Sequence, residues 1–122
     1  MRKSVLIVED EPFILEALSF LLKRERLKVS TFTDGKGCVE YIQSTKPDLV
    51  ILDMMLPNRS GMQILEDLRA MDAFTSLPVL MLTAKGQKKD RAAAEQAGVS
   101  LFMTKPFANK EIIQNVHRLL GK

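Results

Sequence analysis

The chain contains little cysteine and no long apolar run, and both absences narrow its class. Cys38 is the single cysteine among 122 residues, so no disulfide can form within the chain. A lone thiol is typical of proteins in reducing compartments, and we expect a cytoplasmic location. No run approaches the roughly 18 apolar residues of a membrane span. The N-terminal run VLIV is too short for a signal peptide, so we expect neither secretion nor membrane attachment.

The chain also lacks a strong charge of either sign. Its formal net charge is +3, and Lys and Arg are scattered apart from a cluster of Lys85, Lys88, Lys89 and Arg91. A nucleic-acid-binding surface needs a denser basic stripe with aromatic partners. We therefore interpret the cluster as a solvated helix face and expect no direct nucleic-acid binding.

Hydrophobic residues are plentiful and recur in short runs. They make up 46% of the chain, enough for one core, and the length suits a single domain spanning 1–122. The runs are VLIV (5–8), KVSTF (28–32), DLVIL (48–52), PVLML (78–82) and SLFM (100–103). The central runs lack polar–apolar alternation, which is typical of strands covered on both faces.

The segments between these runs have helical spacing. Pro12 suits the first turn of a helix, and Gly98 is placed to end the fourth helix. The residues that we expect to cap the second, third and fifth helices are Asp34, Ser60 and Asn109. The apolar side of the fourth helix is mostly alanine, at 92–94 and 97. Alanine buries little area, so this helix is either weakly held or packed closely onto the sheet.

Five strand–helix units with short connections predict an α/β fold with one parallel sheet and helices on both faces. The expected architecture is a flavodoxin-like (βα)5 three-layer sandwich with strand order 2-1-3-4-5. Its switch point lies between the first and third strands. That order brings Glu9 and Asp10, which follow the first strand, beside Asp53, which follows the third.

Three carboxylates at one point repel one another unless a cation is present. Mg²⁺ prefers oxygen ligands and commonly links one or two carboxylates to a phosphate. We expect Asp10 and Asp53 to bind it directly, with Glu9 acting directly or through water. The backbone carbonyl of Met55 is a further expected ligand, and Mn²⁺ is an expected substitute for Mg²⁺. We interpret Glu11 mainly as an acid favoured at a helix N-terminus.

Three further groups suit phosphoryl chemistry at the same edge. Asp53 can act as a nucleophile, because carboxylates form aspartyl phosphates. Thr83 offers a hydroxyl to a phosphoryl oxygen, and Lys105 offers a point charge. Singly, each has an ordinary alternative as a turn residue, a local hydrogen-bonding group or a solvated loop charge. Together, all at strand ends, they indicate one site.

The motifs VLIVEDEP, LVILDMMLPNRSGMQIL, PVLMLTA and TKPF resemble the receiver domain of two-component response regulators over essentially the whole chain. The resemblance implies that Asp53 accepts a phosphoryl group from a sensor histidine kinase or a phosphotransfer protein. It implies that Thr83 and the aromatic Phe102 switch the face made by the fourth helix, fifth strand and fifth helix. It also implies a cis Lys105–Pro106 bond. Such a domain is a signalling phosphoacceptor rather than an enzyme.

The resemblance also implies partners. The switched face would control a downstream output domain or target protein, and we expect no output domain within 1–122. Arg91 and Glu111 match a charged pair through which many such regulators form phosphorylation-dependent homodimers. However, Ser100 and Leu101 replace acidic residues that are common at the start of the fifth strand.

Other functions fit the residues less well. A haloacid-dehalogenase-type phosphatase needs a second Asp at position 55, where this chain has Met55. A flavodoxin cradles a phosphate in its first loop, where Glu9, Asp10 and Glu11 would repel it. A pseudo-receiver that acts only by docking is the remaining alternative. His117 is expected to be an exposed bystander on the last helix.

Overall fold

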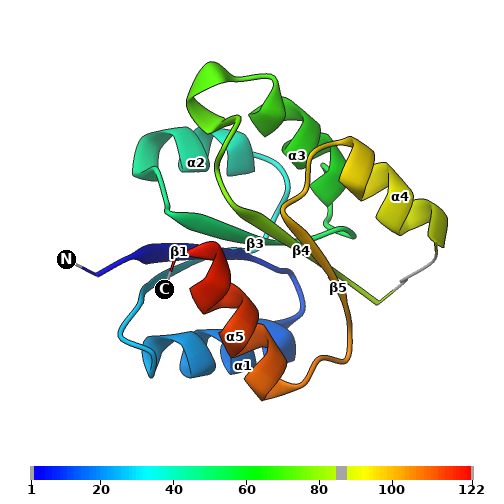
Figure 1. Cartoon of the computed structure of the whole chain (residues 1–122). Helices are drawn as coiled ribbons and strands as arrows, with labels where there is room; N and C mark the ends of the chain where they lie inside the picture. The colour runs from blue at the N-terminus through cyan, green and yellow to red at the C-terminus, as the bar shows by residue number, and fades with distance from the viewer. Residues whose placement is uncertain (1, 85–87, 122) are drawn as a thin grey trace.

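The computed structural model describes residues 2–84 and 88–121 and contains one five-stranded sheet (Figure 1). The strands are β1 (Ser4–Val8), β2 (Lys28–Phe32), β3 (Leu49–Asp53), β4 (Val79–Thr83) and β5 (Leu101–Thr104). All neighbouring pairs are parallel, and the order is β2-β1-β3-β4-β5. The predicted flavodoxin-like strand order is therefore confirmed.

Helices cover both faces of the sheet. They are α1 (Pro12–Lys23), α2 (Cys38–Thr45), α3 (Gly61–Arg69), α4 (Lys88–Gln96) and α5 (Asn109–Leu119), with a short 3₁₀ turn η1 (Asp72–Phe74). Figure 1 shows α1 and α5 on one face and α2, α3 and α4 on the other. Within the described residues, no helix is both long and apolar enough to cross a membrane.

Strand residues alternate between two cores, because successive side chains point to opposite faces of a sheet. Leu6 and Leu52 belong to the core under α2, α3 and α4, whereas Ile7 and Ile51 belong to the core under α1 and α5. Every residue of β3 and β4 is buried. Burial on both faces explains why these runs are apolar up to their last residues. The polar residues Asp53 and Thr83 occur only at the carboxyl ends of these two strands.

Three of the expected helix ends are confirmed. Pro12 is the first residue of α1. The Ser60 hydroxyl accepts a hydrogen bond from Gln63 N, and the Gln63 side chain accepts one from Ser60 N, which makes a reciprocal capping box. Gly98 follows α4 with a φ of +94°, a conformation that glycine adopts without steric cost.

Two expected caps are wrong. Asp34 does not cap α2, whose N-cap is Gly37 at a φ of +80°. Its carboxylate instead accepts from Lys36 N in the preceding turn, at 2.8 Å. Asn109 is the first residue of α5 rather than its cap, because Ile112 N donates to the carbonyl of Ala108. Local hydrogen bonding shifted both boundaries.

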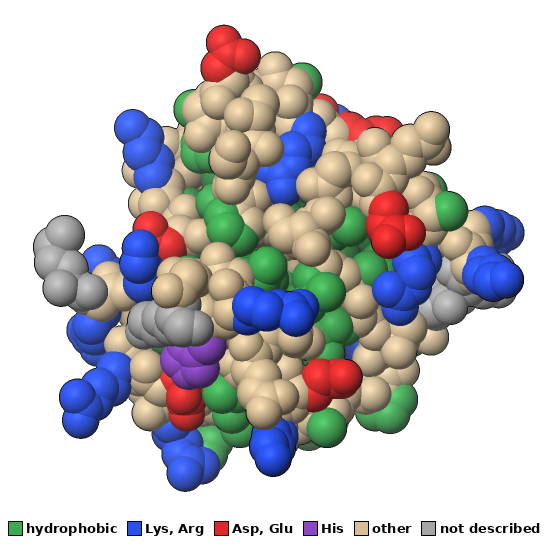
Figure 2. Space-filling view, in the orientation of Figure 1, with side chains coloured by type: hydrophobic (Ala, Val, Ile, Leu, Met, Phe, Trp, Pro, Cys, Tyr) green, Lys and Arg blue, Asp and Glu red, His purple; other side chains and the backbone are tan. Residues whose placement is uncertain are grey.

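Helix α4 is attached to the domain by few side chains. Ala94 is its one buried residue, whereas Ala92 and Ala93, which we expected on the packed side, are exposed. Of the two alternatives left open by the sequence, weak attachment and close packing on the sheet, this burial favours weak attachment. Lys88, Lys89 and Arg91 are exposed on the same helix, and Lys85 lies outside the described residues. On the face shown in Figure 2, Lys and Arg side chains are separated by acidic, hydrophobic and other residues.

Candidate functional site

The five polar groups predicted from the sequence lie at the carboxyl edge of the sheet. Glu9 and Asp10 directly follow β1, Asp53 is the last residue of β3, Thr83 is the last residue of β4, and Lys105 follows β5. Parallel register brings these ends to one level, since Asp53 pairs with Leu82 and Thr83 with Thr104. Open α/β sheets bind ligands at this edge.

A cleft of about 340 Å³ opens at this edge. The residues that line it are Glu9, Asp10, Glu11, Asp53, Met55, Ala84 and Lys105. All the predicted metal ligands are among them. Glu11, interpreted from the sequence as a helix-terminal acid, is the N-cap residue of α1 without a side-chain capping bond, and it also borders the cleft.

The carboxylates of Glu9, Asp10 and Asp53 form one cluster. One oxygen from each lies within 4.8 Å of the others. Glu9 is 1% exposed and Asp53 is 4% exposed, whereas Asp10 faces solvent. Two of the three negative charges are therefore desolvated, which is costly unless a cation lies close.

Lys105 is the cation that the chain itself supplies. Its Nζ lies 2.8 Å from Glu9 Oε1 and 3.4 Å from Asp53 Oδ2. Burial alone would lower the pKa of Lys105, but the contacts with Glu9 and Asp53 outweigh it and raise that pKa. The Lys105 N–H donates to the Thr83 carbonyl at 2.8 Å, and the Lys105–Pro106 bond is cis, as expected.

Among the described residues, the one ammonium of Lys105 faces three carboxylates and does not balance their charge. Burial, opposed by Lys105 and reinforced by Asp53, raises the pKa of Glu9. Glu9 Oε1 is fully buried and, although it is ion-paired with Lys105, it receives no well-aligned hydrogen bond among the described residues. A buried acceptor of this kind, beside two more carboxylates, fits a hard divalent cation such as Mg²⁺.

Backbone amides orient the two buried carboxylates. Met55 N donates to Asp53 Oδ1 at 3.1 Å, and Glu11 N donates to Glu9 Oε2 at 3.2 Å. The second oxygen of each side chain is directed to Lys105. Each carboxylate therefore has one oxygen held by its own loop and the other at the common centre of the cleft.

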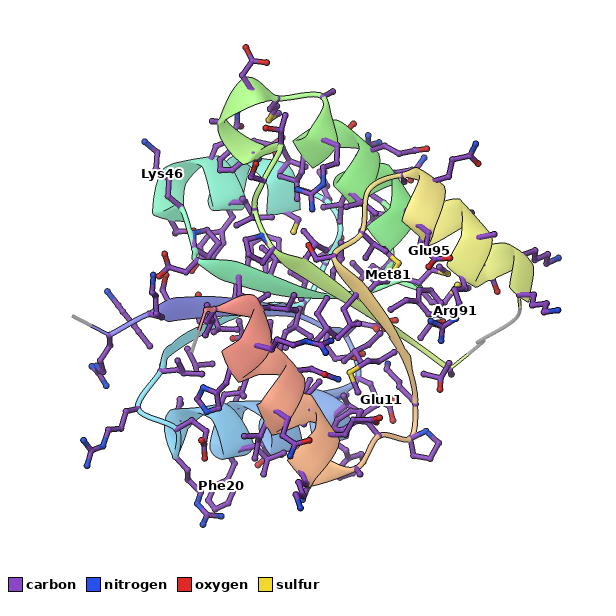
Figure 3. All side chains as sticks on the ribbon, in the orientation of Figure 1. Glu11, Phe20, Lys46, Met81, Arg91 and Glu95 are labelled. Carbon is purple, nitrogen blue, oxygen red and sulfur yellow. The ribbon has the colours of Figure 1, made fainter. Side chains whose placement is uncertain are left out.

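Thr83 is the last residue of β4 and Phe102 lies in β5, and neither is among the residues that line the cleft. Thr83 is fully buried, and Phe102 is 5% exposed and pairs with Met81 across β4 and β5. The guanidinium carbon of Arg91 lies 5.0 Å from the centre of the Phe102 ring. Figure 3 shows Arg91 extending from α4 toward β5. The sequence predicted Arg91 to lie on a solvated helix face or to pair with a second copy of the domain, and its contact with Phe102 was not predicted.

His117 is not part of the site, as expected, but it is partly buried rather than exposed. Its Nε2 lies 2.7 Å from Glu25 Oε1, in the segment that follows α1. The two partners are 92 positions apart in the sequence, so no local pattern predicted this contact.

Comparisons with known proteins agree with this geometry. The family model described as "Response regulator receiver domain" matches residues 5–117. The chain is 39% identical over 119 residues to "Probable transcriptional regulatory protein TcrX" of Mycobacterium tuberculosis, covering 98% of this chain and 50% of that protein. It is 36% identical over 122 residues to the alkaline phosphatase synthesis transcriptional regulatory protein PhoP of Bacillus subtilis, covering 100% of this chain and 50% of PhoP.

A solved structure extends the comparison to the site. The receiver domain of the sensor histidine kinase PA1611 from Pseudomonas aeruginosa, which has a magnesium ion coordinated in its active site cleft, superposes with a TM-score of 0.90. The two sequences are 26% identical, and the match covers 100% of both chains. This chain spans about half the length of the two transcriptional regulators. By family match, sequence identity and fold, the chain belongs to the response regulator receiver domain family.

Proposed function

We propose that this domain accepts a phosphoryl group on Asp53 from a sensor histidine kinase or a phosphotransfer protein, in a reaction that requires Mg²⁺. One observation carries the proposal. The buried Asp53 carboxylate lies beside Glu9 and Asp10 and within 3.4 Å of the Lys105 ammonium, in a cleft open to a donor. The carboxylate nucleophile, the oxygen ligands for a hard cation and the ammonium that would pair with phosphate therefore lie together in one cleft.

The chain's own groups divide the chemistry among them. An Asp53 carboxylate oxygen forms a bond to phosphorus while the bond from phosphorus to the donor's nitrogen or oxygen breaks, and the donor keeps that electron pair. Lys105, released from Asp53, pairs with a phosphoryl oxygen, and Thr83 donates its hydroxyl to another. Asp10, Asp53 and the Met55 carbonyl, with Glu9 directly or through water, would hold Mg²⁺. Bound there, the ion neutralises charge on the transferring group.

We further propose that the domain is a phosphoacceptor rather than a phosphatase with rapid turnover. Position 55 carries the thioether Met55, which is 56% exposed at the cleft and cannot act as a general acid or base. Hydrolysis of the aspartyl phosphate would therefore proceed without a side-chain proton donor at that position.

The proposed output is a change of the α4–β5–α5 face through Thr83 and Phe102. Thr83 is the last residue of β4, and the β5 residue Phe102 belongs to the same core as Ala94 of the weakly attached α4. Two relatives, of which this chain covers 50% each, are named as transcriptional regulatory proteins. Their names support control of a downstream output domain or target protein. Dimerisation through Arg91 and Glu111 is part of the proposal, although Arg91 is stacked on Phe102 here.

Incubation of the wild-type domain with acetyl phosphate tests the proposal directly. With Mg²⁺ present we expect one phosphoryl adduct by intact mass, and with EDTA we expect none. Peptide mapping after borohydride reduction should place the adduct at residue 53. An adduct that forms equally well in EDTA would refute the metal requirement. No adduct from either acetyl phosphate or a set of kinases would favour the docking-only alternative.

Thr83→Ala should separate phosphorylation from its output. We expect the variant to bind Mg²⁺ and to form the adduct, but phosphorylation should change amide exchange in α4 much less than in the wild type. Hydrogen exchange of residues 88–96, measured with and without the phosphoryl group, checks this. Equal changes in the two proteins would contradict the role of the hydroxyl.

A further inference from the structure

The loop between β3 and α3, residues 54–60, carries one of the proposed metal ligands and is held at both ends. Gly61 N donates to the Met54 carbonyl at 3.0 Å, just before Met55. Just after Met55, the Pro57 carbonyl accepts two backbone N–H groups, from Gly35 at 3.1 Å and Arg59 at 2.8 Å. The Met55 carbonyl therefore lies between two fixed carbonyls.

Side chains add a second connection between this loop and the β2–α2 loop. The amide Nδ2 of Asn58 donates to both oxygens of Asp34, at 2.9 and 2.8 Å. Asn58 has a φ of +69°, a left-handed conformation that Asn tolerates better than most residues. Lys36 N donates to the same Asp34 carboxylate, so Asp34 is itself fixed to its own turn. These hydrogen bonds hold the pKa of Asp34 below its ordinary value.

The two loops touch so closely that a side chain cannot enter between them. A Cβ added to Gly35 would lie 1.8 Å from the carbonyl oxygen of Arg59. The contact is made of backbone on both sides, so a flexible side chain cannot move aside to make room. The β2–α2 loop therefore packs directly against the backbone of the β3–α3 loop and limits how far that loop can move toward it.

We propose that Asp34 and Asn58 are positioning residues that hold the Met55 carbonyl toward the metal site. Neither side chain lines the cleft, so both act through the backbone of the loop. The inference rests on the proposed function, because it concerns Mg²⁺ binding at Asp53. Residues that orient a metal ligand from outside its coordination sphere commonly change metal affinity by about 10- to 100-fold when replaced.

Three variants and one control test the proposal. Asp34→Ala removes the acceptor, and Asn58→Gly removes the donor while glycine keeps the positive φ. Asp34→Asn retains one acceptor oxygen and should restore part of the affinity. Arg59→Ala is the control, because it removes the Arg59–Asp67 ion pair of the same loop without touching Asp34.

The readout is Mg²⁺ affinity in the absence of any phosphoryl donor, followed by amide NMR shifts of residues 53–61. We expect about tenfold weaker binding for Asp34→Ala and Asn58→Gly, a smaller loss for Asp34→Asn, and wild-type affinity for Arg59→Ala. Wild-type affinity in all variants would overturn the positioning role and leave the proposed function intact. An equal loss in Arg59→Ala would also overturn it, because any loosening of the loop would then suffice. Absence of Mg²⁺ binding by the wild type would overturn the proposed function as well.

Discussion

Asp53→Asn is expected to abolish formation of the phosphoryl adduct and, at the same time, to stabilise the metal-free domain. An amide is a far weaker nucleophile than a carboxylate, so adduct formation should fall below detection. The stability gain follows from charge. Within the part of the chain that the structure describes, three clustered carboxylates face the one ammonium of Lys105, and Asp53 is nearly fully buried. Removing one negative charge should raise the free energy of unfolding by about 1 kcal/mol.

Calorimetry with and without Mg²⁺ separates the two effects. Without metal, the variant should unfold about 4 °C higher than the wild type, as expected for a gain of about 1 kcal/mol in a domain of this size. Added Mg²⁺ should stabilise the wild type more than the variant, because binding to the folded state adds stability by mass action. Asp72→Asn, a surface change in η1 outside the cleft, is the control and should alter neither property. A variant less stable than the wild type without metal would contradict the repulsion argument.

Gly61→Ala is expected to destabilise the fold and displace the phosphoacceptor strand end. A Cβ at Gly61 would lie 2.2 Å from the Asp53 carbonyl oxygen and 2.9 Å from Met54 Cα. Both neighbours are backbone atoms of the segment that carries the nucleophile, so relief requires a shift of α3 or of the end of β3. We expect a loss of about 3 kcal/mol, the upper end for overpacking, and a fall in Tm of about 12 °C.

The matched control for this change is Gly121→Ala. Gly121 has a left-handed backbone conformation, with a φ of +81°, but a Cβ added there would meet no atom within 4 Å. It should cost about 1 kcal/mol from the backbone conformation alone. Both the Tm of thermal unfolding and the rate of adduct formation should fall much further in Gly61→Ala than in Gly121→Ala. Similar losses in the two variants would show that no steric conflict exists at position 61.

Signals of short range were sufficient to predict the elements that carry the site. The apolar runs at 5–8, 48–52 and 78–82 are continuous because both faces of these strands are buried, and burial depends on composition that the sequence displays. The Ser60 cap and the Pro12 start are similarly local. Since parallel strands place their carboxyl ends at one edge, the meeting of Glu9, Asp10 and Asp53 followed from strand order.

Signals of short range also misled at the starts of two helices, α2 and α5. Asp34 has the spacing of a helix cap, yet its carboxylate binds Asn58, 24 residues away, and Gly37 is the N-cap of α2 instead. Asn109 looked like a cap, but the Ala108 carbonyl accepts the first bond of α5. Local propensity is worth about 1 kcal/mol at such positions, so one tertiary contact or a one-residue shift can override it.

The sequence alone determined the alternation of strands and helices, the sheet order that we expected, and the set of acidic, hydroxyl and ammonium groups at the strand ends. Only the tertiary structure decided how those groups pair. Lys105 lies nearer to Glu9 than to Asp53, and the exposed Arg91 places its guanidinium over the Phe102 ring. These contacts join different loops and helices, so their distances depend on the position of each helix and loop relative to the sheet. The periodicity or spacing of residues within a single segment does not specify that position.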